Sequence, residues 1–210
     1  MDTTHDLTFA ELRRVNVDRC VNAFRHPLDG WSLADWGVAY GGEVGEALNV
    51  IKKFNRARDG LAGNSVDTAT LHRMLGDELA DAVIYADLLA ARIDALIASR
   101  SFAQFRIGTV SDRLGAEDLS LSDWGMLALR RAGELHGMLT DLADGRRPRM
   151  FPAMALGECV RSLDLIAVAA GIDLGAAVIA KFNATSEKLG YPQRLGVPDP
   201  AAAVEGGAAA

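Results

Sequence analysis

An internal duplication constrains the fold of this chain more than any other feature of its sequence. Three pairs of segments match in the same order along the chain: SLADWG and SLSDWG, from Ser32 and Ser120; ADLLA and LDLIA, from Ala86 and Leu163; and SDRLG and SEKLG, from Ser111 and Ser186. Ordered matches of this kind indicate a repeated structural unit. No Pro/Gly/Ser-rich spacer separates the copies, so we expect a pseudo-dimer packed about an approximate two-fold axis.

Residue types and capping signals predict that both units are helical. Half of the 210 residues are hydrophobic, mainly Ala, Leu, Val and Ile, and only 6% are aromatic. TFAE at Thr8–Glu11 and SLAD at Ser32–Asp35 fit capping boxes, which predict one helix to about Phe24 and a second that ends in a loop at about 55–65. Leucines at helical spacing predict a long helix from about 67 to about 99. We expect an all-α helical bundle of two tandem repeats, at 1–117 and 118–195, followed by a disordered tail at 196–210.

Charge and hydropathy argue against several classes of function. The formal net charge is −6, whereas a general nucleic-acid binder needs clustered Lys and Arg to neutralise phosphates. No apolar run reaches the roughly 20 residues of a membrane span, and the N-terminus lacks the order of a signal peptide. Cys20 and Cys159 are isolated and form no disulfide framework. We therefore expect a cytoplasmic protein that binds neither nucleic acid nor a membrane.

Two pairs of acidic residues form the candidate site. Glu43 and Glu46 stand three residues apart, on one face of a helix, and Glu78 and Asp81 repeat this spacing in the next long helix. Apolar residues surround both pairs, so facing carboxylates would repel strongly unless a cation lay between them. Four oxygen donors with no His or Cys nearby suit Mg²⁺ or Mn²⁺ better than Zn²⁺. The alternative for one pair alone is a solvated acidic face.

Four glycines lie close to the first acid pair: Gly37, Gly41, Gly42 and Gly45. Each glycine in a helix interior costs about 1 kcal/mol relative to alanine. We expect the close approach of another helix or of a ligand to offset this cost.

The acid pairs follow a pattern that is typical of a known family. Glu43-x-x-Glu46 followed by Glu78-x-x-Asp81 resembles the ExxE…ExxD signature of the MazG-like, all-α nucleoside triphosphate pyrophosphohydrolases. Three longer segments extend the resemblance over most of the chain: DWGVAYGGEVGEALNVIKKF, DELADAVIYADLLAARI and GIDLGAAVIAKFNATSEKLGYP. The resemblance implies helical bundles that assemble as dimers or tetramers, here with a dimer fused into one chain. It also implies Mg²⁺-dependent hydrolysis of a (d)NTP to the monophosphate and pyrophosphate, with the four acids as metal ligands and catalytic residues.

The second copy keeps only part of the acid set. Arg131 stands at the position of Glu43 and Ala155 at that of Glu78, whereas Glu134 and Glu158 retain the other two acidic positions. Because two of four acids are lost, we expect no equivalent metal cluster in the second copy.

The second copy instead keeps two residues that the first copy lacks at the corresponding positions. AKFNATSEKLG resembles the family's Lys-Phe-Asn segment, which contributes phosphate and nucleotide contacts, and it contains Lys181 and Asn183. When SDRLG is aligned with SEKLG, these two residues correspond to Arg106 and Gly108 of the first copy. We expect a composite site, with metal ligands from the first copy and nucleotide contacts from the second. The alternative is that both residues only pack or cap the last helix.

Three further residues are candidate substrate contacts. Trp31 occurs only in the acid-bearing copy and has a ring that can stack on a base, although core packing is the alternative. Tyr85 continues the helical face of Glu78 and Asp81, and Lys53 follows the first acid pair at a distance from which it can reach a phosphate.

Other functions stay open at this level. Phosphoribosyl-ATP and dUTP pyrophosphatases have similar acid pairs, and a non-catalytic helical nucleotide-binding or regulatory module is an alternative from another class. A di-iron bundle would need a Glu-x-x-His pair, whereas the second motif here ends in Asp81. The preferred base and sugar, and any further homodimer of two chains, also stay open.

Overall fold

The computed structural model describes residues 6–63, 65–113 and 119–197, and within these residues it is helical, without a β-strand. The helices are α1 (Phe9–Asn22), the short 3₁₀ helix η1 (Leu28–Gly30), α2 (Leu33–Arg58), α3 (Thr68–Arg92), α4 (Phe102–Arg113), α5 (Leu121–Ala143), α6 (Pro152–Ala170) and α7 (Leu174–Lys188). The predicted all-α class is confirmed. Residues 198–210, which make up most of the predicted tail, lie outside the described residues.

The two SxxD motifs form the same local structure at the start of α2 and of α5. The Ser32 hydroxyl accepts a hydrogen bond from the Asp35 amide at 3.1 Å, and the Asp35 carboxylate accepts one from the Ser32 amide at 3.0 Å. Ser120 and Asp123 make the equivalent pair of bonds at 3.3 and 2.8 Å. Each box satisfies two amide groups that the first helical turn would otherwise leave unpaired, so the sequence fixes both helix starts locally.

Two predicted helix ends are wrong. α2 continues to Arg58 instead of giving way to a loop near Asn55, and the Asn55 amide donates a hydrogen bond to the Ser122 hydroxyl of α5 at 2.8 Å. α3 stops at Arg92, well before residue 99. Just beyond it, Asp94 has a φ of 51°, which a continuing right-handed helix excludes.

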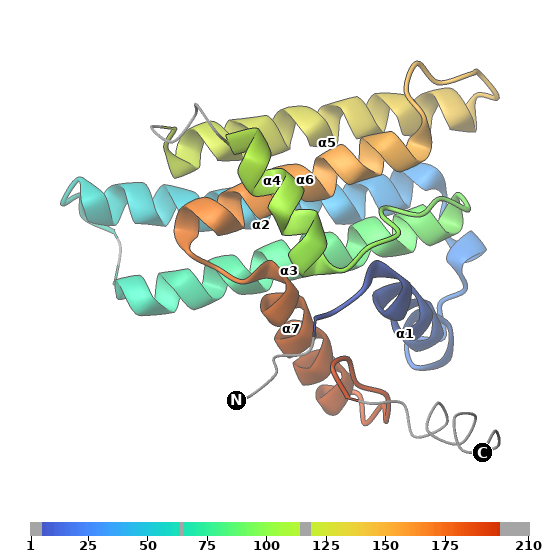
Figure 1. The fold of residues 1–210 in the computed structure, drawn as a ribbon, viewed down its shortest axis with the longest axis horizontal. Helices are drawn as coiled ribbons and strands as arrows, with labels where there is room; N and C mark the ends of the chain where they lie inside the picture. Colours follow the sequence, from blue (N-terminus) through green and yellow to red (C-terminus); the bar gives the residue numbers. More distant parts are fainter. Residues whose placement is uncertain (1–5, 64, 114–118, 198–210) are drawn as a thin grey trace.

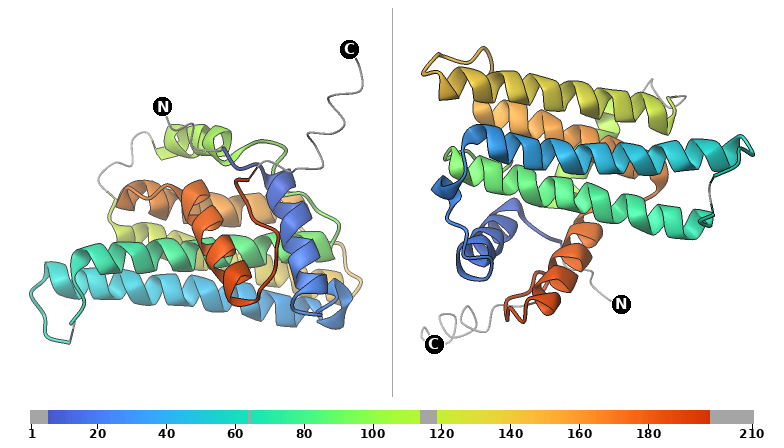
Figure 2. Two further views of the ribbon diagram at one scale, coloured as in Figure 1. Left: turned by 90° about the horizontal axis from the view of Figure 1, so that it is seen from below. Right: turned by 180° about the vertical axis from the view of Figure 1, so that it is seen from behind.

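Four long helices lie side by side and form the body of the molecule. α2 packs against α3 and α5, α5 packs against α6, and α3 packs against α6 (Figure 1). α4 crosses α6 and also contacts α7, whereas α1 and α7 lie against α3 (Figure 2). The acid-bearing helix α3 therefore contacts helices from both ends of the chain.

The interior is one hydrophobic core that draws on every α-helix. Its largest fully buried side chains include Phe9 from α1, Trp36 and Tyr40 from α2, Leu156 from α6 and Phe182 from α7. Because a single core joins the two predicted repeats, they do not form independent bundles on a linker.

Two glycines allow α2 and α5 to approach closely. A Cβ at Gly37 of α2 would lie 3.0 Å from the ring of His136, and a Cβ at Gly125 of α5 would lie 2.8 Å from the Leu48 side chain. The predicted role of glycine in close helix packing therefore applies to Gly37. Gly45, by contrast, faces open space.

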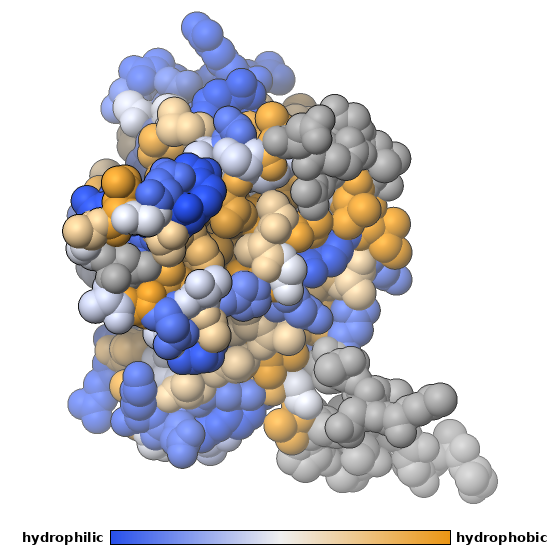
Figure 3. All heavy atoms as spheres, turned by 90° about the vertical axis from the view of Figure 1, so that its left-hand side faces the viewer, coloured by the Kyte–Doolittle hydropathy of each residue, from blue (hydrophilic) through white to orange (hydrophobic). Residues whose placement is uncertain are grey.

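Within the described part of the chain, no single helix is both long and apolar enough to cross a membrane, although α6 and α7, bent by 104° relative to each other, pass that test as a pair. The face shown in Figure 3 mixes hydrophilic and hydrophobic residues.

Candidate functional site

Three of the four predicted acids converge between α2 and α3. Glu43 and Glu46 project from α2 and Glu78 projects from α3, and each offers a carboxylate oxygen within 4.8 Å of the other two. Asp81 lies one turn further along α3. It forms an ion pair with Lys181 of α7, with 2.7 Å between Lys181 Nζ and Asp81 Oδ2. The i, i+3 spacing places each pair on one helical face, and the packing of α2 on α3 turns the two faces toward each other.

Burial and the repulsion of neighbouring carboxylates raise the pKa of Glu43 and of Glu78. Burial raises the pKa of Glu43 to about 7, and the charges of Asp81, Glu46 and Glu78 add to this shift. The pKa of Glu78 is raised by burial first and then by Glu46. Glu43 and Glu78 are partly buried and Glu46 is exposed. Because the three carboxyl groups are close together, a cation that neutralised them would favour their ionised form.

The Asp81–Lys181 pair is an internal source of positive charge at the edge of this cluster. Burial raises the pKa of Asp81, while the hydrogen bond and charge of Lys181 oppose that shift. Burial acts to lower the pKa of Lys181, but its hydrogen bond with Asp81 and the nearby charges of Asp77 and Glu78 outweigh this effect and raise it. The two shifts differ in what they favour: the raised pKa of Lys181 favours its charged form, whereas the raised pKa of Asp81 shows that burial outweighs the contact with Lys181. The 2.7 Å contact between the two side chains is what identifies the ion pair.

The donor set fits a hard divalent cation. Three carboxylate oxygens within 4.8 Å of one another match the oxygen ligands that Mg²⁺ and Mn²⁺ take in proteins. Asp81 completes the predicted set of four, although its ion pair with Lys181 makes it the least available of the four carboxylates.

An aromatic pocket opens beside Asp81. It has a volume of about 320 Å³ and is lined mainly by residues of α1, of the α1–α2 connection and of α3, with one residue each from α2 and α7. Its aromatic wall contains His26, Trp31 and Trp36, with ring centroids 4.6 Å apart for His26 and Trp31 and 4.9 Å apart for Trp31 and Trp36. Tyr85 lies on the same side as Asp81. Flat rings next to a carboxylate cluster are suited to a ligand with one planar end and one anionic end.

The remaining predicted substrate residues take different positions. Trp31 and Tyr85 line the pocket, and Lys181 contacts Asp81 directly. Lys53 lies on α2, two helical turns beyond Glu46. The Asn183 side chain is used elsewhere: its amide donates to the Leu195 carbonyl at 3.0 Å and accepts from the Leu195 amide at 2.8 Å. It therefore ties down the C-terminal segment, as the packing alternative expected.

Sequence reasoning missed Arg19 of α1. Its side chain is only 3% exposed, lies within the core and lines the pocket. The sequence does contain a signal for its burial, because Arg19 follows Leu12 and Val15 at helical spacing on the apolar face of α1. A charged residue on that face has to be buried.

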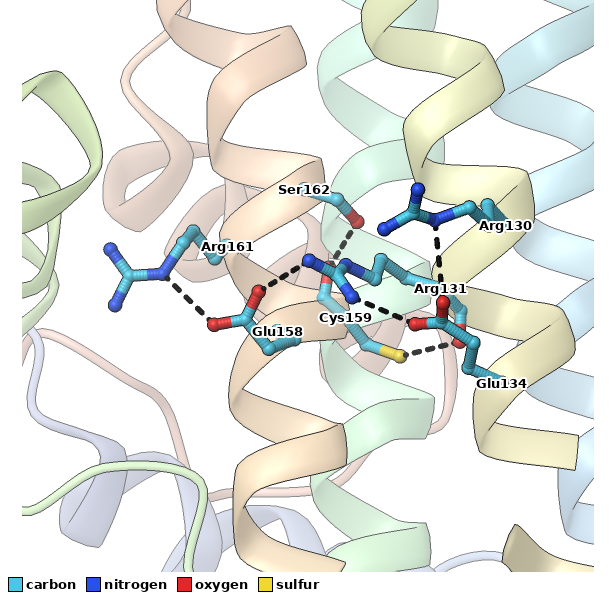
Figure 4. Close-up of polar contacts among 7 residues, drawn as sticks. All are labelled: Arg130, Arg131, Glu134, Glu158, Cys159, Arg161 and Ser162. Carbon is cyan, nitrogen blue, oxygen red and sulfur yellow. Dashed lines mark hydrogen bonds and ion pairs between the residues drawn. The ribbon is translucent and has the colours of Figure 1, made fainter. Parts of the chain in front are cut away.

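The corresponding positions of α5 and α6 form a different cluster, shown in Figure 4. The Arg131 guanidinium lies between two carboxylates, 2.8 Å from Glu134 and 3.0 Å from Glu158. Arg130 and Arg161 add outer ion pairs at 3.3 and 3.6 Å. The predicted loss of the acid set in this half has therefore left an ion-pair network.

No family model matches the chain, and no curated protein or solved structure gives a significant match.

Proposed function

We propose that the chain is a Mg²⁺-dependent nucleoside triphosphate pyrophosphohydrolase, related to the MazG-like enzymes, which hydrolyses a dNTP to the monophosphate and pyrophosphate. The observation that carries this proposal is the convergence of Glu43, Glu46 and Glu78 from two helices, directly beside an aromatic pocket that contains Asp81 in its wall. The first feature fits a triphosphate–metal complex and the second fits a nucleobase.

The acids would hold the cation and the chain's own lysine would meet the phosphates. When bound, Mg²⁺ neutralises phosphate charge and favours attack by water and departure of pyrophosphate. Lys181 supplies a fixed positive charge 2.7 Å from Asp81, at the junction between the acid cluster and the pocket. There it can bind a phosphate oxygen and orient the triphosphate.

The pocket would hold the base and exclude water from it. Trp31 is 37% exposed, whereas Trp36 is buried and is fixed by a hydrogen bond from its indole nitrogen to the Leu28 carbonyl at 2.9 Å. A fixed inner ring and a more accessible outer ring together suit a base that enters from solvent and stacks. Tyr85 lies between this wall and Asp81.

Reciprocal contacts support the pseudo-dimer. Gly37 meets His136 while Gly125 meets Leu48, and in the register of the SxxDWG motifs these are the same contact made twice, with α2 and α5 exchanged. In an isologous interface, residue i meets j and the counterpart of i meets the counterpart of j. This reciprocity supports the proposal of a dimer-like interface within one chain.

The same symmetry pairs α4 with α1. Arg13 of α1 donates to buried Asp87 of α3 at 2.8 Å, and Arg106 of α4 donates to buried Asp164 of α6 at 2.6 Å. The segments preceding the two helices form an antiparallel bridge, and the rings of Phe9 and Phe102 stack at 4.3 Å. The SDRLG match pairs α4 with α7, whereas these contacts favour α1–α2–α3 and α4–α5–α6 as the repeats, with α7 as an additional helix.

This arrangement gives α7 a role in the composite site. α7 packs extensively against α3 and much less against α6. Lys181 of α7 therefore reaches the acid cluster of the first repeat. The last helix would thus complete the site of the acid-bearing half only.

Pyrophosphate release tests the proposal. A panel of NTPs and dNTPs, with Mg²⁺ and then with Mn²⁺, should yield pyrophosphate and the monophosphate from at least one nucleotide. Release of orthophosphate alone, or no turnover of any member, would reject the enzyme and favour a non-catalytic nucleotide-binding module. Including dUTP and phosphoribosyl-ATP in the panel separates the two related activities.

A further inference from the structure

Arg19 is a buried guanidinium with an unusual set of partners. All its hydrogen bonds to the described residues leave from Nη1, which donates to the Phe182 carbonyl at 2.8 Å and to the Ser186 hydroxyl at 3.3 Å. The guanidinium also lies 3.5 Å over the Phe182 ring. Nε is buried and has no partner among the described residues.

No carboxylate lies within ion-pair distance of Arg19 in the described part of the chain. Burial lowers its pKa to about 10, opposed first by the charge of Asp81. Taking a guanidinium out of water without a directly paired anion is costly. A ligand that offered acceptors to the unused N–H groups would recover part of that cost.

The unused groups belong to a residue of the pocket wall. Arg19 lines the pocket together with His26, Trp31, Trp36 and Tyr85, so a planar ligand held by the aromatic rings has its edge near the guanidinium. A guanidinium has only donors and does not lose its proton in proteins. The part of the ligand that meets Arg19 must therefore be an acceptor, and an amino group there would place donor against donor.

We propose that Arg19 determines base specificity, by donating to the carbonyl oxygen of a 6-oxopurine or 4-oxopyrimidine base and rejecting the corresponding amino bases. This inference rests on the proposed function for its substrate, a nucleotide whose triphosphate lies at the acid cluster. It adds the class of base, which neither the acid motifs nor the aromatic wall specifies.

Matched nucleotide pairs test this inference. dUTP and dCTP differ at the 4-oxo or 4-amino group, and dITP and dATP differ at the 6-oxo or 6-amino group. For at least one pair we expect kcat/KM to favour the oxo nucleotide by about tenfold or more, the order of discrimination that one hydrogen bond supplies. Equal values, or a preference for the amino nucleotide in both pairs, would overturn the proposal.

A variant locates the preference at Arg19. Arg19→Met should reduce the oxo/amino ratio to near one, chiefly through the oxo substrate, whereas Arg14→Met, at an exposed position of the same helix, should preserve it. A ratio that survives Arg19→Met would overturn the assignment. If the loss of the hydrogen bonds to Phe182 and Ser186 prevents Arg19→Met from folding, the oxo/amino ratios of the wild type still test whether the protein prefers an oxo base.

Binding without catalysis separates this inference from the proposed function. In EDTA, quenching of tryptophan fluorescence should report tighter binding of dUMP than of dCMP, or of dIMP than of dAMP, because Trp31 and Trp36 line the pocket. If no triphosphate is hydrolysed but this order holds, the enzyme proposal fails and base recognition stands. The reverse order in both pairs would overturn the role of Arg19 even in an active enzyme.

Discussion

The α2–α3 cluster and the α5–α6 cluster solve the same electrostatic problem in different ways. In α2–α3, carboxylate oxygens of Glu43, Glu46 and Glu78 lie within 4.8 Å of one another, and the charge of Lys181 acts on them from the edge of the cluster. In α5–α6, Arg131 takes the position that corresponds to Glu43 and bridges two carboxylates (Figure 4). The second cluster has a guanidinium at its centre, whereas the first has Lys181 at its edge, paired with Asp81.

Carboxyl groups of the two clusters have pKa shifts of opposite sign. Burial raises the pKa of Glu43 to about 7, whereas the hydrogen bond from Arg131 lowers the pKa of Glu134. The Arg131 guanidinium is part of the chain, so the carboxylates of the second cluster are neutralised without a metal ion. We infer that the halves have separated into a reactive one and a structural one.

The largest expected effect is on activity. Glu46→Gln should reduce Mg²⁺-dependent pyrophosphate release by about 10²–10³-fold, the order that one electrostatic contact to a transition state contributes. The matched control is Glu134→Gln at the corresponding position of α5, which should change the rate less than about threefold because Glu134 only pairs with Arg130 and Arg131. Equal losses of pyrophosphate release in the two variants would contradict a functional difference between the two halves.

A second substitution makes the α2–α3 cluster resemble the α5–α6 cluster. Glu43→Arg should place a guanidinium beside Glu46 and so remove the need for a cation. We expect a folded protein whose Tm no longer rises with Mg²⁺, while saturating Mg²⁺ stabilises the wild type by about 2.7 kcal/mol at a hundred times its Kd. Differential scanning calorimetry with Mg²⁺ or EDTA measures this. A variant that still gained stability from Mg²⁺ would contradict the assignment of Glu43.

Stability should depend on pH in EDTA. The pKa of Glu43 lies near 7 in the folded protein and at 4.5 ordinarily, so between these values the folded state holds a proton that the unfolded chain has released. Stability is therefore highest near pH 4.5, falls as the pH rises toward 7 and then levels off, as far as this group is concerned. Because the group is only half-buried, solvent screening reduces the change to about 1–2 kcal/mol.

Thermal unfolding at pH 5, 6, 7 and 8 in EDTA measures this dependence, and Glu43→Gln supplies the control. The difference in Tm between wild type and variant should change across this range, since the amide does not titrate. Saturating Mg²⁺ should raise Tm more at pH 8 than at pH 5, because the cation binds the ionised carboxylates. A difference between wild type and Glu43→Gln that is the same at every pH would refute the shifted titration.

The smallest expected effect is on the structural cluster. Arg131→Met should lower the free energy of unfolding by about 1 kcal/mol, because its partners are partly exposed and such pairs are weak, and it should leave kcat nearly unchanged. Arg130→Met, at a more exposed position, should cost less. Urea denaturation separates the two, and a loss of activity in Arg131→Met without a loss of stability would point to a catalytic role for this half.

Local patterns in the sequence predicted much of the fold and part of the site. The capping boxes at Ser32 and Ser120 begin helices because the groups that bond are three residues apart. The acid pairs share helical faces for the same reason. Helix ends were less predictable, since Asn55 stays helical in contact with α5.

Contacts between distant segments could not be predicted in this way. The sequence grouped Lys181 with Asn183, but only Lys181 reaches the acid cluster, while Asn183 binds Leu195. Four glycines near the first acid pair looked alike, yet Gly37 and Gly41 approach His136 and Gly42 and Gly45 face open space. In each case the neighbour comes from another helix, and its position depends on how the whole core packs.

The sequence alone determined the helices, the duplication and the loss of acids from the second copy, because these depend on residue identity and short spacings. The tertiary structure decided that three glutamates meet, that Lys181 pairs with Asp81 and that Arg131 bridges Glu134 and Glu158. It also decided that Arg19 is buried in the wall of the pocket. Charges that lie far apart in sequence affect one another only after packing has brought them within a few ångströms and excluded the water between them.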